Sequence, residues 1–286
     1  MQISIIMPTH NRGFIIPKAI SSIISQTHTE WELVIIDDGS TDKTQETVQK
    51  YVEKDDRIRY FKIHHKGTPF AWNLGIAKSK NHLILFVGDD CKLHKNCLEN
   101  LVKTVKNLDG KNFGAIAPRL IYVKDIDNPK ENDIDEAKYA HVDPATGDIA
   151  GTFNAKIQKT IEVPIIHGYS LTRKEVLEEV GGFDQTTYKG NFYREETDLW
   201  LRIQKRGYKL YYEPTAIIYC QKGLTKGGQW SNVKENPLTY EYYVICNHYK
   251  FLKKFYGKRR FFMLPAFLLR RLYTWMLQLY ARTKTS

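Results

Sequence analysis

The sequence has few cysteines, and none of them are spaced as metal ligands usually are. Its 286 residues include only Cys91, Cys97, Cys220 and Cys246, and no two of these form a C-x-x-C pair. We therefore expect neither a zinc site nor a disulfide framework, and this cysteine usage suits a reducing cytoplasm. The first residues lack a basic segment followed by an apolar core, so no signal peptide is expected.

Long apolar runs are also scarce. The run at residues 261–269 contains Pro265 and is too short to cross a bilayer. Hydrophobic residues make up 42% and charged residues 26% of the chain, which is typical of a globular protein and excludes extensive disorder. At this length we expect one large α/β domain, alone or with an appendage.

Acidic residues are absent from the C-terminal segment. Residues 242–286 hold ten Lys or Arg and twelve aromatic residues, whereas residues 1–241 hold 33 basic and 32 acidic residues. The net charge of +11 therefore belongs to the tail. This distribution argues against a nucleic-acid-binding core and indicates an appended cationic surface.

Strand and helix patterns alternate in the first half of the chain. Predicted strands cover residues 3–7, 32–36, 58–63 and 82–87, and predicted helices cover 15–25, a capped segment ending at 52, 71–78 and 98–108. This alternation predicts an α/β fold with a mostly parallel, doubly wound sheet flanked by helices. Ligands bind outside the carboxyl ends of such strands, where the pairs Asp37–Asp38 and Asp89–Asp90 lie.

The pattern loosens after residue 116. Residues 124–160 are polar and rich in turn formers, which predicts a loop with a hairpin laid over the sheet. Helices are then expected at 173–180 and 195–205, and short strands at 208–212 and 216–219.

Several short motifs follow one another along residues 1–223, and each is weak alone. They are Pro8-Thr9-His10-Asn11-Arg12, Asp37-Asp38-Gly39-Ser40-Thr41-Asp42, Ala71-Trp72-Asn73-Leu74-Gly75, Gly88-Asp89-Asp90, Gly181-Gly182-Phe183-Asp184 and Glu195-Glu196-Thr197-Asp198-Leu199. In this order and spacing the chain resembles a family 2 glycosyltransferase with the GT-A fold.

The resemblance implies an inverting enzyme that uses a nucleotide-sugar donor. It places a catalytic domain at residues 1–225, with a nucleotide-binding half at 1–115 and an acceptor half at 116–225. Residues 226–286 are then a helical extension rich in basic and aromatic side chains.

The resemblance assigns a carboxylate of the Asp37–Asp38 pair to recognition of the base. A buried carboxylate accepts a hydrogen bond from the imide N–H of uracil, which cytosine lacks at that nitrogen, so we favour Asp38 and a UDP-sugar. The alternative is a turn followed by a helix cap. By position, further donor contacts are expected from Pro8, Thr9, Asn11, Arg12, Asn73 and Asp89.

The segment Gly88-Asp89-Asp90 is the predicted metal site. Hard divalent cations such as Mg²⁺ or Mn²⁺ take carboxylate ligands, so we expect Asp90 to bind the metal and Asp89 to contact the ribose or the metal. The common family pattern is Asp-x-Asp, and this chain has glycine first. Relatives commonly carry a histidine ligand where this chain has Cys220, whose thiolate suits neither ion. His248 or water would replace it. The alternative to a metal site is that Asp89 and Asp90 are two exposed loop acids.

An inverting transfer also needs a general base. The resemblance places it at Glu196, with Glu195 in reserve and Asp198 in an orienting role. Such a base removes the proton of the acceptor hydroxyl during attack on the anomeric carbon. The alternative is an ordinary solvated first turn of a helix.

The tail at 242–286 has two interpretations. An interfacial amphipathic helix on an anionic membrane explains its basic and aromatic residues, and so does a helix pair that packs on the catalytic domain or on a second copy in a homodimer. We expect no nucleic-acid partner and a cytoplasmic location, peripheral on the membrane.

The predicted activity is transfer of a sugar from a nucleotide diphosphate to a hydroxyl of a glycan or lipid-linked acceptor. One alternative is a decayed GT-A scaffold that is recruited to membranes as a binding protein. A sugar nucleotidyltransferase is less favoured because the glycine-rich phosphate loop after the first strand is missing. A nicotinamide enzyme is excluded by the lack of GxGxxG there.

Overall fold

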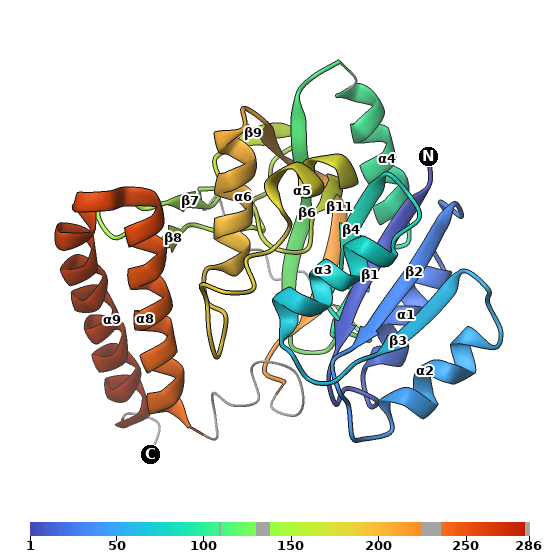
Figure 1. Ribbon diagram of the computed structural model, residues 1–286, viewed down its shortest axis with the longest axis horizontal. Coiled ribbons are helices and arrows are strands. Elements are labelled where there is room, and N and C mark those ends of the chain that lie inside the picture. Colours follow the sequence, from blue (N-terminus) through green and yellow to red (C-terminus); the bar gives the residue numbers. More distant parts are fainter. Residues whose placement is uncertain (109, 130–137, 225–235, 284–286) are drawn as a thin grey trace.

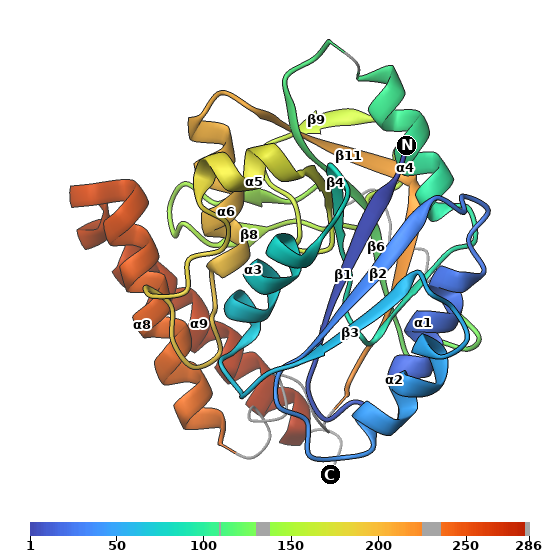
Figure 2. The same ribbon diagram turned by 45° about the vertical axis from the view of Figure 1, so that its right-hand side comes forward.

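The computed structural model describes residues 1–108, 110–129, 138–224 and 236–283. A mixed nine-stranded sheet lies at its centre with helices on both faces, and two C-terminal helices form a separate hairpin at one side (Figures 1 and 2). The predicted α/β architecture is confirmed. The predicted boundary between 225 and 226 lies outside the described residues.

The first half of the sheet is parallel, with strand order β3-β2-β1-β4. These strands are β1 (Ile3–Thr9), β2 (Trp31–Asp37), β3 (Ile58–Lys62) and β4 (Leu83–Phe86). β1, β2 and β4 are almost continuous apolar runs because helices cover both faces of a parallel sheet. The connecting helices are α1 (Ile16–Ile24), α2 (Thr44–Val52) and α3 (Thr68–Lys78). Thr9 pairs with Asp37 across β1 and β2, so the polar residues that end both strands share one edge.

The second half of the sheet is mixed. β10 (Leu171–Arg173) runs antiparallel between β4 and β6 (Phe113–Val123), and β11 (Lys209–Gln221) runs parallel to β6. β5 (Cys91–Leu93) and β9 (Ile161–Val163) pair antiparallel with β11.

Two strand predictions need correction here. The strands predicted at 208–212 and 216–219 are one strand, β11, with an irregularity between Glu213 and Ile217. Pro214 lies within it and cannot donate a ladder hydrogen bond. β6 was not predicted, because Pro118 and Arg119 interrupt its apolar run although both are well packed in the structure.

Three more helices and a hairpin complete the part of the chain before residue 225. The helices are α4 (Cys97–Asn107), α5 (Lys174–Val180) and α6 (Glu195–Lys205). β7 (His141–Val142) and β8 (Ile149–Ala150) form an antiparallel hairpin within the predicted segment 124–160, of which 130–137 lie outside the described residues.

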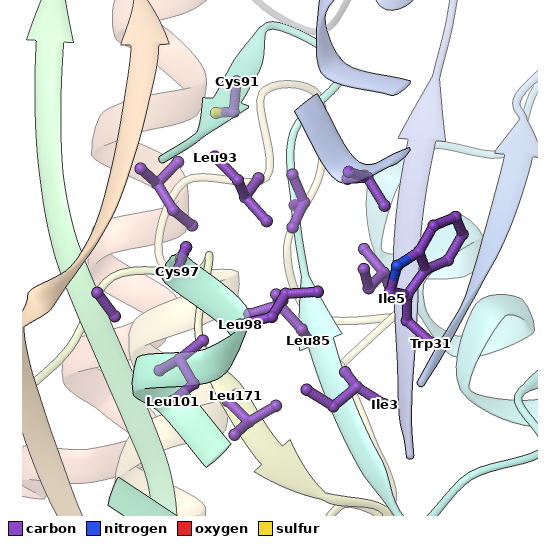
Figure 3. Close-up of a cluster of buried hydrophobic side chains, with 14 of the residues drawn as sticks. Ile3, Ile5, Trp31, Leu85, Cys91, Leu93, Cys97, Leu98, Leu101 and Leu171 are labelled. Carbon is purple, nitrogen blue, oxygen red and sulfur yellow. The ribbon is translucent and has the colours of Figure 1, made fainter. Parts of the chain in front are cut away.

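Figure 3 shows the core between the sheet and α4. Ile3 and Ile5 of β1 and Leu85 of β4 lie opposite Leu98 and Leu101 of α4, and all five side chains are completely buried. Burial of each such side chain contributes about 1.5–3 kcal/mol. This packing holds the strand ends, and therefore the site residues, at fixed positions.

The C-terminal helices are α8 (Pro237–Tyr256) and α9 (Arg260–Thr283), joined by the short helix η1 (Gly257–Arg259). One side of this helical hairpin packs on the preceding part of the chain, where Tyr188, Phe251, Leu252 and Met263 form a buried cluster. Contact with the catalytic domain was one of the two interpretations of the tail. In the part of the chain that the structure describes, no helix combines the length and apolarity needed to cross a membrane.

Candidate functional site

The pair Asp89–Asp90 follows β4 at the carboxyl edge of the sheet. Thr9, at the end of the neighbouring β1, donates a hydrogen bond from Oγ1 to Oδ2 of Asp89 over 2.7 Å. Burial and the adjacent charge of Asp90 raise the pKa of Asp89 to about 7, and burial also raises the pKa of Asp90. Two carboxylates held together in this way favour a nearby cation.

Arg12 lies beside this pair. Its side chain is buried, and among the described residues its Nε and Nη1 have no hydrogen-bond partner. Its charge opposes the rise in the pKa of Asp89 and Asp90. A buried guanidinium with two N–H groups to offer suits a phosphate oxygen. The structure therefore places Thr9, Arg12, Asp89 and Asp90 together, as the motifs predict.

Gly88 is a glycine for steric reasons. A Cβ at this position would lie 2.8 Å from Oδ1 of Asp90 and 2.9 Å from the hydroxyl oxygen of Tyr169. An aspartate at position 88 would therefore displace one of these two groups.

Glu196 lies in the first turn of α6 and approaches the backbone of Gly168. A Cβ on Gly168 would lie only 2.2 Å from Oε1 of Glu196, so no other residue fits there without moving the carboxylate. Burial raises the pKa of Glu196 to about 7, although a hydrogen bond from the backbone of Gly168 opposes the rise. A carboxylate with this pKa accepts a proton efficiently near neutral pH.

Glu195 is held in its protonated form more strongly than its neighbour. It is buried, its Oε2 has no partner among the described residues, and burial together with the charge of Glu196 raises its pKa well above the usual value. Asp198 is also buried, but it pairs with Arg202 at 2.5 Å and with Lys254 at 2.6 Å. These contacts fit the orienting role predicted for Asp198.

Two tyrosines, Tyr122 and Tyr169, interact electrostatically with both Glu196 and Asp90. Tyr122 is 55% exposed, and partial burial of its ring, followed by the charges of Glu196 and Asp90, raises its pKa. Burial also raises the pKa of Tyr169, with Asp90, Glu196 and Asp89 contributing to the rise. Glu196 lies against Gly168, and the hydroxyl of the next residue, Tyr169, lies beside Gly88 and Asp90. The structure therefore brings the predicted base and the predicted metal ligand to one site, although the motifs are more than a hundred residues apart.

The Asp37–Asp38 pair organises the neighbouring loops. Asp37 accepts hydrogen bonds from the backbone N–H of Ser40 and from the hydroxyl of Tyr60. The carboxylate of Asp38 accepts the backbone N–H of Lys66 at 2.7 Å and that of Gly67 at 2.9 Å. Both carboxylates are buried and stabilise turns. This agrees with the alternative interpretation of the motif, a turn followed by a helix cap, and leaves recognition of the nucleobase as a prediction.

Two histidines beside Asp38 were missed in the sequence. His10 donates from Nδ1 to the carbonyl oxygen of Asp38 over 2.8 Å, and Nδ1 of His65 lies 2.8 Å from Oδ2 of the same residue. The two rings are 4.7 Å apart and tilted by 39°. Each histidine follows a predicted strand, and this position at the carboxyl end of a strand is the sequence feature that could have indicated a role in the site.

The two asparagines predicted as donor contacts have structural partners instead. Oδ1 of Asn11 accepts the backbone N–H of Thr41 at 2.7 Å, and its Nδ2 lies 3.1 Å from His10. Asn73 donates to the carbonyl oxygen of Phe183 and accepts its backbone N–H, both over 2.8 Å. Both amides are thus engaged within the protein, and the roles of Asn11 and Asn73 as donor contacts stay predictions. Pro8 lies within β1, where it pairs with Ile36 of β2.

The cysteine prediction is wrong in one respect. Cys91 and Cys220 form a disulfide, although 129 residues separate them and the sequence shows no pairing pattern. They meet because β5 and β11 pair antiparallel with these two residues opposite each other. Both cysteines are buried. His248, the suggested substitute ligand, is buried and contacts Thr146 and Arg194, not the acidic pair.

The chain matches the family described as "Glycosyl transferase family 2" over residues 4–181, which include Thr9, Arg12 and both acidic pairs. It belongs to this family.

Among curated family relatives, glycosyltransferase GlyG of Streptococcus pneumoniae is 32% identical over 108 residues, which are 37% of this chain and 36% of that protein. The GalNAc(5)-diNAcBac-PP-undecaprenol beta-1,3-glucosyltransferase of Campylobacter jejuni is 34% identical over 104 residues, which are 36% of this chain and 34% of that protein. The matched segment spans between 15% and 39% of the length of eight such relatives.

Solved structures share the fold of this family 2 glycosyltransferase. GalNAc-T7, crystallised with UDP, GalNAc and Mn²⁺, superposes with a TM-score of 0.66 at 18% identity, over 78% of this chain and 44% of that one. Residues 1–349 of TarS from S. aureus superpose with a TM-score of 0.56 at 17% identity, over 94% of this chain and 71% of that one. The predicted GT-A fold is thereby confirmed.

Proposed function

We propose that this glycosyltransferase moves a sugar, with inversion, from a nucleotide diphosphate to a hydroxyl of a glycan or lipid-linked acceptor, and that UDP is the favoured nucleotide. The observation that carries the proposal is the placement of Glu196, with a pKa of about 7, at one site with Asp89, Asp90 and the buried Arg12. A proton acceptor and a binding place for a diphosphate are the two parts that this reaction needs.

Glu196 accepts the proton of the acceptor hydroxyl while the oxygen of that hydroxyl bonds to the anomeric carbon. The bond from that carbon to the diphosphate oxygen breaks on the opposite face, so the configuration inverts. Glu196 is preferred over Glu195 because Glu195 is more deeply buried and its pKa is raised further by the charge of Glu196. Arg12 offers two N–H groups to the departing diphosphate.

The donor set also fits a hard divalent cation. Asp89 and Asp90 present carboxylates whose pKa values are raised by burial, and for Asp89 also by its neighbour, so a dication beside them relieves an unfavourable charge. When bound there, Mg²⁺ or Mn²⁺ would neutralise charge on the diphosphate. The GalNAc-T7 structure, which was solved with UDP and Mn²⁺, supports this choice of ion and nucleotide.

The proposed acceptor and the proposed nucleobase are supported by a relative's name and by the surroundings of Asp38. The C. jejuni relative is named for a polyprenyl-linked acceptor, which favours a lipid-linked acceptor here. For recognition of the nucleobase, the carboxylate of Asp38 is buried between two loops, and the rings of His10 and His65 flank it. An imidazole pair offers stacking surface to a uracil beside the predicted contact from Asp38.

Calorimetry with UDP tests the donor half of the proposal. We expect Mn²⁺ to tighten UDP binding by roughly 10-fold or more in the wild-type protein and to have no such effect in Asp90→Asn. Asp56→Asn is the control, since Asp56 is an exposed acid just before β3, at the edge of the sheet opposite the carboxyl ends of the strands. Binding of UDP that ignores Mn²⁺ in the wild type would reject the metal site. Binding without turnover of any nucleotide sugar would favour the decayed-scaffold alternative.

We also propose that α9 lies on an anionic membrane surface. Its outer side exposes apolar residues at helical spacing, namely Phe262 (82% exposed), Leu269 (67%), Tyr273 (63%) and Met276 (61%). Lys258 and Arg259 are exposed on η1, next to the start of this stripe. Apolar residues flanked by cations suit the boundary between headgroups and acyl chains. Assembly through this face with a second copy is the competing outcome.

A further inference from the structure

Three metal-binding side chains meet at the edge of the proposed donor site. The ligand atoms of Asp90, Cys91 and Cys220 all lie within 4.8 Å of one another. Sγ of Cys91 is 3.6 Å from Oδ1 of Asp90. In the structure the two sulfurs are joined in a disulfide, so only the carboxylate is available to an ion.

The backbone holds these residues together without the disulfide. Cys91 of β5 and Cys220 of β11 lie opposite each other in an antiparallel pair, with their Cα atoms 4.3 Å apart. The carbonyl oxygen of Asp90 accepts the backbone N–H of Gln221 over 3.0 Å, next to this pair. β11 is also paired with β6 along its length. Breaking the disulfide therefore leaves the two sulfurs adjacent.

We propose that reduction of the Cys91–Cys220 disulfide creates a site for a soft divalent cation of the zinc class, with Asp90, Cys91 and Cys220 as ligands. A dithiol reductant supplies two electrons and two protons, its own thiols become a disulfide, and the sulfur–sulfur bond of the protein becomes two thiols. The cation then displaces both thiol protons and binds the two thiolates.

The ligand chemistry matches this class of ion. Zinc takes thiolates and carboxylates in tetrahedral sites with Zn–S bonds of about 2.3 Å, which separates two sulfurs by about 3.8 Å. Opposed residues whose Cα atoms are 4.3 Å apart reach that separation by rotation of their side chains. Three protein ligands leave the fourth position open. The buried guanidinium of Arg12 lies near Asp90 and offsets the surplus negative charge.

Such a site would let Asp90 bind either of two kinds of metal ion, depending on the redox state of the disulfide. With the disulfide closed, Asp90 offers only oxygen, which suits Mg²⁺ or Mn²⁺. With the disulfide open, two thiolates beside it favour a soft ion over either of those. The redox state of one cysteine pair thus selects the ion that Asp90 holds. Formation of the site does not depend on the proposed sugar transfer.

Cobalt absorption tests the site without an activity assay. The wild-type protein is reduced with dithiothreitol, freed of reductant under anaerobic conditions and titrated with Co²⁺, which occupies tetrahedral zinc sites and absorbs through thiolate-to-cobalt charge transfer. We expect this band to saturate at one ion per chain, to disappear when Zn²⁺ is added, and to be absent from the oxidised protein.

Variants identify the ligands. Cys91→Ser and Cys220→Ser should each lose most of the band, and Asp90→Asn should weaken cobalt affinity by roughly 10-fold or more while keeping the disulfide. Cys97→Ser is the matched control, because Cys97 is a buried cysteine that is free in the structure. No band in reduced, folded protein, as judged by circular dichroism, would overturn the proposal. A band that survives in Cys220→Ser would overturn it equally.

Discussion

Nε of Arg194 donates a hydrogen bond to Nδ1 of His248 over 3.1 Å, which joins the start of α6 to the middle of α8. This contact makes Nδ1 the acceptor, so His248 carries its proton on Nε2 and donates it to the carbonyl oxygen of Thr146 at 2.8 Å. Burial and the charge of Arg194 lower the pKa of His248 to about 3. Arg194 has φ of 85° and immediately precedes Glu195 and Glu196. The C-terminal helical hairpin therefore positions the helix that carries the proposed base.

Replacement of Arg194 should be costly. Arg194→Met leaves the carboxylate of Asp148, its ion-pair partner, partly buried without a cation. We expect a loss of about 3–5 kcal/mol in the free energy of unfolding, measured with urea. Arg270→Met breaks the more exposed pair with Asp143 and should cost about 1 kcal/mol or less. Equal losses in the two variants would contradict the proposed role of Arg194.

Removal of the proposed base should abolish turnover and spare binding. Glu196→Gln should lower kcat by roughly 10²-fold or more, because no other group takes the acceptor proton, while the Kd for the nucleotide stays the same. Glu195→Gln is the matched control and should retain most activity, since burial and the charge of Glu196 raise the pKa of Glu195 and disfavour the charged form that a base needs. Near-normal transfer by a well-folded Glu196→Gln variant would show that the base lies elsewhere.

The rate should depend on pH near neutrality. Since the pKa of Glu196 is about 7, kcat/KM should rise as pH increases through that value and the carboxylate forms. The same raised pKa means that the folded state binds more protons than the unfolded state between pH 4.5 and 7. The contribution of Glu196 to the free energy of unfolding therefore decreases as the pH rises through that interval. A pH–rate profile that is flat from pH 6 to pH 8 would count against Glu196 as the base.

Two glycine substitutions should separate the halves of the site. Gly168→Ala pushes a methyl group against the carboxylate of Glu196, so we expect a lower kcat with unchanged nucleotide affinity. Gly88→Ala pushes against Asp90 and Tyr169, so we expect weaker Mn²⁺-dependent binding of UDP. Measuring kcat and calorimetric Kd for both variants checks this. Identical defects in the two proteins would mean that the effects are general loss of packing.

The exposed side of α9 should govern attachment to lipid. The triple variant Leu269→Ser, Leu272→Ser, Met276→Ser should no longer sediment with vesicles containing anionic lipid, because burial of its apolar side chains provides the insertion energy. Leu238→Ser is the control, since Leu238 is 73% exposed on α8 rather than on α9. Loss of a dimer instead, seen by light scattering with unchanged vesicle binding, would assign this face to a second copy.

Several features of the site were readable in the sequence because they depend on local order. The alternation of strands and helices in residues 1–108 predicts parallel strands, and parallel strands bring their carboxyl ends to one edge. Thr9 and Asp89 follow from this rule and are in fact joined by a hydrogen bond. The motif Glu195-Glu196-Thr197-Asp198 begins a helix in the structure, as expected.

Other features depended on contacts between distant segments. Asn73 has the spacing of a donor contact, but its amide is taken by the backbone of Phe183, 110 residues away. β6 was missed because Pro118 and Arg119 break its apolar pattern, whereas its pairing with β10 and β11 stabilises it as a strand. A local pattern carries no information about which distant group will occupy a polar side chain.

The sequence by itself determined the family, the order of the elements and the identity of the acids at the strand ends, since these follow from short-range periodicity and motif order. Motif order also favours Glu196 over Glu195 as the base, but only the tertiary structure shows how the surroundings of the two acids differ. Glu195 and Glu196 are chemically identical neighbours, and the approach of Gly168 and the depth of burial distinguish them. It likewise decided the partnership of Cys91 and Cys220, because strand pairing, not spacing, sets the distance between two sulfurs.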